Sequence, residues 1–256
     1  MGRIITIANQ KGGVGKTTTA INLSACLAEA GQHVMLVDFD PQGNASSGLG
    51  VETGDYEHTV YDMMAEEAEL DECLVKNIQD NLDVLPSDMN LAGAEIEFQE
   101  VENKETLLKR YLDKVRDDYD FILIDCPPSL NILTINALTA ADTVLVPIQC
   151  EYYALEGLNQ VLKTVELVKR KLNPQLELEG VVFTMYDART NLSLQVVESV
   201  KNNLNQTIYK TIIPRNVRLA EAPSHGMPIN LYDTRSTGAE SYRMLAAEVM
   251  SRGEEL

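Results

Sequence analysis

The chain has 256 residues, of which 45% are hydrophobic and 23% are charged, and its formal net charge is −18. This composition is that of a globular protein and excludes an intrinsically disordered one. The sequence starts without a signal peptide, and no uncharged apolar run approaches the roughly 18 residues that span a bilayer. We therefore expect a cytoplasmic protein without a membrane partner, and the acidic balance disfavours general binding to nucleic acid.

The four cysteines form neither a CxxC pair nor a cluster with histidine; they are Cys26, Cys73, Cys126 and Cys150. Such spacing gives no disulfide framework and no zinc site. We expect four reduced thiols, most of them buried.

Apolar runs of strand length alternate with amphipathic stretches of helix length, without repeats or a linker. The predicted strands are Ile4–Ala8, Val34–Val37, Leu82–Leu85, Phe121–Ile124, Thr143–Ile148, Gly180–Phe183 and Thr207–Ile213. The predicted helices are Thr17–Glu29, Ala92–Gln99, Thr106–Val115, Asn131–Ala140, Ala154–Leu172, Leu192–Leu204 and Ala239–Met250.

The strand runs are mostly continuous, which is typical of parallel strands that helices cover on both faces. The pattern predicts a single α/β domain over residues 1–256, with a doubly wound, mainly parallel sheet of the P-loop NTPase kind. Ligands of such folds bind at the carboxyl ends of the strands.

A glycine-rich loop follows the first predicted strand and runs directly into a helix; it reads Lys11-Gly12-Gly13-Val14-Gly15-Lys16-Thr17-Thr18. Unobstructed backbone N–H groups at a helix N-terminus predict a polyphosphate site. Lys16 supplies a positive charge there, and the Thr17 hydroxyl is a candidate ligand for Mg²⁺. Gln10 stands where the common form of this motif has its first glycine, and an additional lysine, Lys11, opens the loop.

Carboxylates follow two of the predicted strands. Asp125 closes an apolar strand beside the loop, where it can hold a water of the Mg²⁺ shell; a simple turn aspartate is the alternative. Asp40 follows the second strand and can orient or activate an attacking water. Asp38 points to the same side of the sheet as Asp40, and we rank it below Asp40 for that role.

In combination these motifs resemble the ParA/MinD ATPases, whose deviant Walker A pattern is K-G-G-x-G-K-[ST]. The matching segments are 9–18, 37–44, 124–129, 149–157, 213–218 and 221–224. The chain is most similar to the short chromosomal ParA proteins of the Soj type, because the helix-turn-helix region of the larger plasmid ParA proteins is missing before the loop.

The resemblance implies ATP and Mg²⁺ as cofactors, and it makes Asp40, Lys16 and Lys11 the catalytic residues. It implies that Lys11 contacts a phosphate on the partner subunit of an ATP-bound homodimer. It also places the adenine against Pro214 and Asn216, whose amide suits N6–H and a ring nitrogen, although a turn asparagine fits the sequence nearly as well.

Four functions share such a core: DNA partitioning, membrane-bound regulation of the MinD kind, iron–sulfur electron transfer and a metabolic ligase reaction. The acidic tail, residues 251–256, disfavours a membrane-bound regulator, which ends in a basic amphipathic helix. Cys126 and Cys150 do not lie in the glycine-flanked loops that hold clusters. A ligase would use the same loop on a small substrate and would not need Lys11.

The DNA hypothesis rests on a locally basic segment. Residues 188–218 have a net charge of +4, from Arg189, Lys201, Lys210, Arg215 and Arg218 against Glu198. Such a patch predicts salt-sensitive binding to double-stranded DNA without sequence preference, although a solvated helix face is the alternative. The resemblance points to Arg189 and Arg218 as the DNA-binding residues and to nucleoid association.

The resemblance also implies a ParB-type centromere-binding partner that stimulates hydrolysis through a short basic peptide. Residues 52–105 hold seventeen acids and two lysines, a net charge of −15, so most of the negative charge is local. We expect this acidic segment to suit a basic partner peptide.

Overall fold

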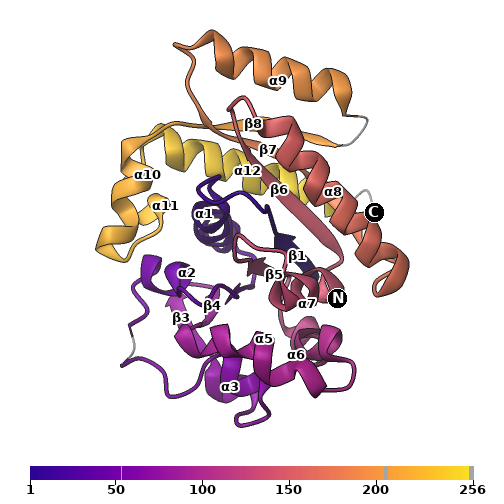
Figure 1. The fold of residues 1–256 in the computed structure, drawn as a ribbon. Coiled ribbons are helices and arrows are strands. Elements are labelled where there is room, and N and C mark those ends of the chain that lie inside the picture. The colour runs from indigo at the N-terminus through magenta and orange to yellow at the C-terminus, as the bar shows by residue number, and fades with distance from the viewer. Residues whose placement is uncertain (53, 205–206, 254–256) are drawn as a thin grey trace.

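The computed structural model describes residues 1–52, 54–204 and 207–253, and eight strands in this part of the chain form one sheet in the order β3-β4-β2-β5-β1-β6-β7-β8 (Figure 1). The strands are β1 (Arg3–Ile7), β2 (Val34–Asp38), β3 (Val75–Gln79), β4 (Leu82–Leu85), β5 (Phe121–Asp125), β6 (Thr143–Gln149), β7 (Glu177–Tyr186) and β8 (Ile208–Pro214). All neighbours are parallel except β3 and β4.

The longer helices are α1 (Lys16–Glu29), α6 (Leu107–Val115), α7 (Ile132–Ala140), α8 (Ala154–Lys171), α9 (Asn191–Asn203) and α12 (Thr237–Gly253). The shorter ones are α2 (Asn44–Gly48), α3 (Val60–Met64), α4 (Leu70–Cys73), α5 (Ala94–Glu97), α10 (Val217–Glu221) and α11 (Ile229–Tyr232). The helix predicted over Ala92–Gln99 is instead three short pieces, because 3₁₀ turns at Met89–Gly93 and Phe98–Glu100 flank α5.

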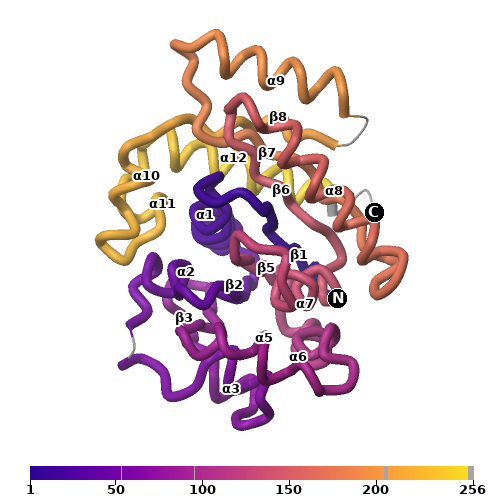
Figure 2. Tube along the Cα trace, in the orientation of Figure 1, coloured from indigo at the N-terminus to yellow at the C-terminus, as the bar shows by residue number. Residues whose placement is uncertain are grey.

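Both faces of the sheet are buried. Successive residues of β1 belong to different core clusters: Ile4 packs on the side of α6, α7 and α8, and Ile5 on the side of α1 and α12. The chain trace in Figure 2 follows this wrapping, with α1 and α7 on either side of β1 and β5. The predicted fold class, a doubly wound and mainly parallel sheet between helices, is therefore confirmed.

The helix α12 fastens the late part of the chain to α1. The Tyr242 hydroxyl lies 3.2 Å from the Thr19 hydroxyl, and the Arg243 guanidinium makes a two-pronged ion pair with Glu29 at 2.7 and 2.8 Å. The helix that starts at the phosphate loop is thus braced along its length by α12.

The four cysteines are free and buried, as predicted. Within the described ranges, no helix combines the length and the apolar character that crossing a bilayer requires.

Candidate nucleotide site

The glycine-rich loop connects β1 to α1 at the carboxyl edge of the sheet, and neighbouring side chains hold its backbone. Gly15 has a φ of 86°, a left-handed conformation that favours glycine, and it directly precedes α1. The Thr184 hydroxyl of β7 donates a buried hydrogen bond to the Val14 carbonyl at 2.8 Å. At the other end, the Asn9 side-chain oxygen accepts from the Lys11 backbone N–H at 3.0 Å. The loop is thus shaped before any ligand binds.

Lys16 places a positive charge at the centre of the site. Its side chain is largely buried, and its Nζ donates to the Lys11 carbonyl at 3.3 Å. Burial lowers the pKa of Lys16, while the negative charges of Asp125 and Asp40 act in the opposite direction. An anionic phosphate bound next to Lys16 would stabilise the charged, protonated form of its side chain.

Asp125 is the last residue of β5 and is completely buried. Its carboxylate oxygens make no hydrogen bond of standard geometry among the described residues, although the Thr17 hydroxyl is close enough to interact with them. Burial raises the pKa of Asp125 well above its ordinary value, the charge of Asp38 raises it further, and the Thr17 hydroxyl and the Lys16 charge lower it. A buried carboxylate with unfilled hydrogen-bonding capacity beside a threonine at a helix start fits Mg²⁺ with its waters, so Thr17 and Asp125 are the residues that would hold the metal.

Asp38 and Asp40 form a second carboxylate group next to Asp125. Asp38 lies opposite Asp125 in the β2–β5 register, and its carboxylate accepts both the Ser46 N–H and the Ser46 hydroxyl at 2.8 Å. Asp40 accepts the Gln42 N–H through Oδ1 at 3.0 Å. Asp40 is 8% exposed, and its Oδ2 makes no hydrogen bond within the described part of the chain, which leaves that oxygen for a water.

The geometry also separates the roles of the two acids. The Asp38 carboxylate binds the first turn of α2 and, more weakly, the Asp40 N–H at 3.3 Å, so Asp38 shapes the segment that presents Asp40. That segment turns at Gly43, which has a φ of 62° and where a Cβ would lie 2.9 Å from the Ser87 carbonyl oxygen. The ranking of Asp40 above Asp38 as the residue that faces the reaction stays a prediction.

A cavity of about 340 Å³ opens between the glycine loop and the loop after β8. Its lining includes Gly15, Thr18, Thr184, Met185, Pro214, Arg215, Asn216 and Tyr242. The phosphate loop and the two residues predicted for the adenine, Pro214 and Asn216, therefore share one cavity. Its volume lies within the range of small-molecule sites, about 300–1,000 Å³.

The Asn216 side chain is already engaged within the chain. Its oxygen caps α10 by accepting the Arg218 N–H at 2.7 Å, and its amide donates to the Thr237 hydroxyl at 2.8 Å. A contact between Asn216 and the adenine stays a prediction, since it requires at least one of these bonds to be exchanged. Sequence reasoning missed Met185, which lines the same cavity in a left-handed conformation with a φ of 50°.

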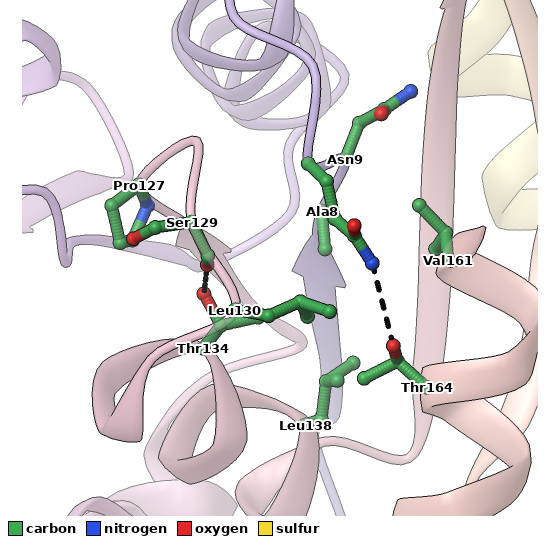
Figure 3. A pocket seen from close by; sticks show the side chains of 10 residues that line it. Ala8, Asn9, Pro127, Ser129, Leu130, Thr134, Leu138, Val161 and Thr164 are labelled. Atoms are coloured by element: carbon green, nitrogen blue, oxygen red, sulfur yellow. Dashed lines mark hydrogen bonds between the residues drawn. The ribbon is translucent and has the colours of Figure 1, made fainter. Parts of the chain in front are cut away.

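The structure explains why Gln10 can stand where the common form of the phosphate-loop motif has its first glycine. The Gln10 amide donates to the Thr164 hydroxyl of α8 at 3.4 Å, the contact that the dashed line at Thr164 marks in Figure 3. A second bond in that view joins the Thr134 hydroxyl to the Ser129 carbonyl at 2.5 Å. The two segments enclose a cavity of only about 10 Å³, room for roughly one water. The Gln10 side chain thus packs toward α8, and a glycine is not needed there.

Lys11 lies on the rim of the site. Its Nζ makes an ion pair with Glu151 at 2.5 Å, and the two side chains are 37% and 45% exposed. Glu151 follows β6, so the pair joins the phosphate loop to the segment that leads into α8. The role of Lys11 toward a partner subunit stays a prediction.

Arg189 and Arg218 lie beyond the carboxyl ends of β7 and β8. The register pairs Tyr186 with Pro214, so the segments that carry the two arginines leave the sheet side by side. Arg215 is fixed beside the end of β7, because its backbone N–H donates to the Tyr186 carbonyl at 2.9 Å. The structure thus places the segments that carry Arg189 and Arg218, 29 residues apart in the sequence, at the same edge of the sheet.

Carboxylates of the chain itself balance these arginines. Arg189 makes a two-pronged pair with Asp187 at 2.8 and 2.7 Å, and Arg218 lies 2.9 Å from Glu221 and 3.5 Å from Asp233. Over residues 187–233 the net charge is +1, compared with the +4 that the shorter segment 188–218 suggested. The patch is weaker than the sequence count implied, although all three arginines are exposed.

Comparison with known proteins agrees with this site. A family model described as an AAA domain matches residues 2–178. The sporulation initiation inhibitor protein Soj of Bacillus subtilis (strain 168) is 59% identical over 99% of this chain and 100% of its own length. The chromosome-partitioning ATPase Soj of Treponema pallidum (strain Nichols) is 52% identical, with 98% of each chain covered. The chain belongs to the ParA/MinD family of ATPases, in its Soj type.

Among solved structures, the cobyrinic acid a,c-diamide synthase from Mycobacterium smegmatis with bound ADP and magnesium is 37% identical, with a TM-score of 0.87. The similarity covers 99% of this chain and 96% of that one. The predictions of the family, of ATPase activity, and of ATP and Mg²⁺ as cofactors are confirmed by these relations. The roles of individual site residues stay predictions.

Proposed function

We propose that this ParA/MinD-family ATPase acts in the partitioning of a chromosome or plasmid. It forms an ATP-bound homodimer that binds double-stranded DNA without sequence preference, and hydrolysis, stimulated by a ParB-type partner, releases the DNA. The observation that carries the DNA step is the position of Arg189, Arg215 and Arg218, on the segments that follow β7 and β8 at the edge of the sheet where the nucleotide cavity opens. Two relatives with at least 52% identity are named for partitioning or as Soj, which supports the same function.

The geometry supports a role for each of the site residues. The loop N–H groups and Lys16 would hold the phosphates, and Thr17 and Asp125 would hold Mg²⁺. Mg²⁺, when bound, neutralises negative charge on the phosphates. The free oxygen of Asp40 orients the attacking water and accepts its proton, while Asp38 fixes the backbone that carries Asp40. Lys11 reaches the phosphate of the second subunit, so that both subunits complete the site.

We propose that residues 1–256 act as one domain in the cytoplasm, at the nucleoid. The single sheet supports the assignment of one domain, because it contains every strand from β1, which begins at Arg3, to β8, which ends at Pro214. An acidic region, residues 52–105, surrounds α3 and α5 at the lower end of Figure 1, while α9 lies at the upper end. A basic segment of the ParB-type partner and the DNA phosphates would therefore meet different parts of the surface.

A metabolic ligase is the second candidate, because the diamide synthase named above is similar over nearly the whole chain. A membrane-bound regulator of the MinD kind has less support. The sequence argument against it is the acidic tail, residues 251–256, of which residues 254–256 lie outside the described residues. An iron–sulfur carrier is disfavoured, since Cys126 and Cys150 are buried in the core, whereas a cluster held between subunits needs cysteines at the surface.

A mobility-shift assay separates partitioning from the ligase reaction. The Asp40→Ala protein should retain ATP without hydrolysing it, and should shift nonspecific duplex DNA with ATP but not with ADP. Retarded DNA with either nucleotide, or no retardation at low salt with ATP, would refute the proposed cycle.

Paired variants test the DNA surface. In the Asp40→Ala background, Arg189→Ala with Arg218→Ala removes four cations per dimer, so the slope of log K against log salt should decrease in size by about 3 to 4. Arg110→Ala with Arg235→Ala removes the same charge from two other exposed arginines and should leave the slope unchanged. Dimerisation with ATP should persist in both proteins; its loss in the first alone would place these arginines at the subunit interface instead.

A further inference from the structure

The ion pair between Lys11 and Glu151 joins two backbone segments that are themselves fixed. The Asn9 side chain holds the Lys11 N–H, and the Glu151 carbonyl accepts the Ala154 N–H at 3.0 Å in the turn before α8. Only the Lys11 side chain is therefore free to move when the pair opens. The 2.5 Å separation places the ammonium group directly against the carboxylate in the isolated subunit.

The surface beside this pair is aromatic and uncovered. Tyr152 and Tyr153 follow Glu151 directly, are 81% and 64% exposed, and stack edge to face with ring centres 5.1 Å apart. Adjacent large exposed aromatic side chains are typical of protein interfaces. The Lys11–Glu151 pair thus lies at the margin of a surface that a second copy of the chain, brought to Lys11 by the proposed ATP dimer, would cover.

We propose that Glu151 is a positioning residue that restrains Lys11 in the free subunit and has to release it before the ATP dimer forms. One ammonium group cannot stay in direct contact with Glu151 and also contact a phosphate across the interface. A triphosphate has more negative charge than a diphosphate and competes better with the carboxylate. Glu151 therefore raises the threshold for dimerisation and increases its dependence on ATP. The inference rests on the proposed function.

The size of the effect follows from the exposure of the pair. An exposed ion pair changes an equilibrium by about two- to fivefold. Each dimer requires two such pairs to open, so the dimerisation constant should change by about 4- to 25-fold when both are removed. Since both side chains are partly exposed, opening the pair should not unfold the loop.

The test compares three proteins in the Asp40→Ala background: the parent, Glu151→Gln and Glu156→Gln. Glu156 lies in the first turn of α8, is exposed and has no ion pair within the described residues, so it controls for loss of one negative charge. Sedimentation equilibrium with ATP gives the dimerisation constant of each. We expect Glu151→Gln to dimerise 4- to 25-fold more tightly than the parent, to dimerise detectably with ADP, and Glu156→Gln to match the parent.

A second measurement needs no dimer. In the nucleotide-free proteins, amine-reactive labelling followed by mass spectrometry should modify Lys11 faster in Glu151→Gln than in the parent or in Glu156→Gln. If the parent forms an ATP dimer and Glu151→Gln dimerises equally or more weakly, the restraint by Glu151 is refuted and the proposed function stands. If the parent forms no ATP dimer, the proposed function fails and this inference fails with it.

Discussion

Asp38 is a carboxylate whose charge opposes folding, and replacing it should stabilise the ligand-free protein. The side chain is completely buried, and burial raises its pKa from 3.8 to about 6 despite three hydrogen bonds that lower it. In Asp38→Asn, a neutral oxygen can still accept the two bonds from Ser46. The contact with the Asp40 N–H, which is 3.3 Å long, is lost.

The pH dependence of this effect has a definite sign. The unfolded chain ionises Asp38 at a lower pH than the folded protein does, so ionisation favours the unfolded state. The free energy by which ionised Asp38 destabilises the folded protein begins to increase above pH 3.8, grows until about pH 6 and is constant at higher pH. Two-state linkage with these values gives about 2 kcal/mol at pH 5 and about 3 kcal/mol at pH 7.5. Loss of the Asp40 contact offsets about 1 kcal/mol, which leaves a net gain of about 2 kcal/mol at pH 7.5.

Urea unfolding followed by circular dichroism, without nucleotide and Mg²⁺, measures this gain. The advantage of Asp38→Asn over the wild type should increase by about 1 kcal/mol between pH 5 and pH 7.5. Asp80→Asn, which alters an exposed acid, controls for the reduction of net charge. An advantage that is equal at both pH values, or no larger than that of Asp80→Asn, would refute a buried charge at Asp38.

Three further variants test other parts of the site and core. Thr184→Val removes the bond to the Val14 carbonyl and should weaken binding of a nonhydrolysable ATP analogue by about 2- to 10-fold in calorimetry, with Thr184→Ser close to wild type. Asp125→Asn should abolish the gain in nucleotide affinity that Mg²⁺ gives, so titrations with Mg²⁺ and with EDTA should coincide. Glu179→Gln leaves Arg3 without its buried partner and should cost about 3 to 5 kcal/mol of unfolding free energy, whereas a cost below 1 kcal/mol in urea titration would contradict a buried ion pair.

The sheet and the phosphate loop could be predicted because their sequence signals are local. Most of the described strands contain continuous apolar runs, and the loop lies between the first of them and a helix. The strand β3 was missed because its sequence, Val75–Gln79, lies at an edge of the sheet and its apolar residues are interrupted by Lys76 and Asn77. An edge strand buries little apolar surface, so its sequence is weakly constrained.

Tertiary partners could not be predicted from the sequence. Thr184 is 170 residues from Val14 and belongs to an ordinary-looking strand, so nothing near it in the sequence marks its contact with the phosphate loop. The net charge of the DNA patch was overestimated for the same reason. Asp187 lies just outside the segment that was counted, two residues before Arg189, and only folding brings Asp233 against Arg218.

The bracing of α1 by α12 has a consequence for synthesis of the chain. Tyr242 both lines the nucleotide cavity and contacts α1, yet α12 is translated more than 200 residues after the phosphate loop. At about 5 to 20 residues per second, this interval is about 10 to 40 s. A nascent chain on the ribosome therefore has its phosphate loop long before the cavity beside that loop is complete. The finished cavity requires α12 to have emerged and packed against α1.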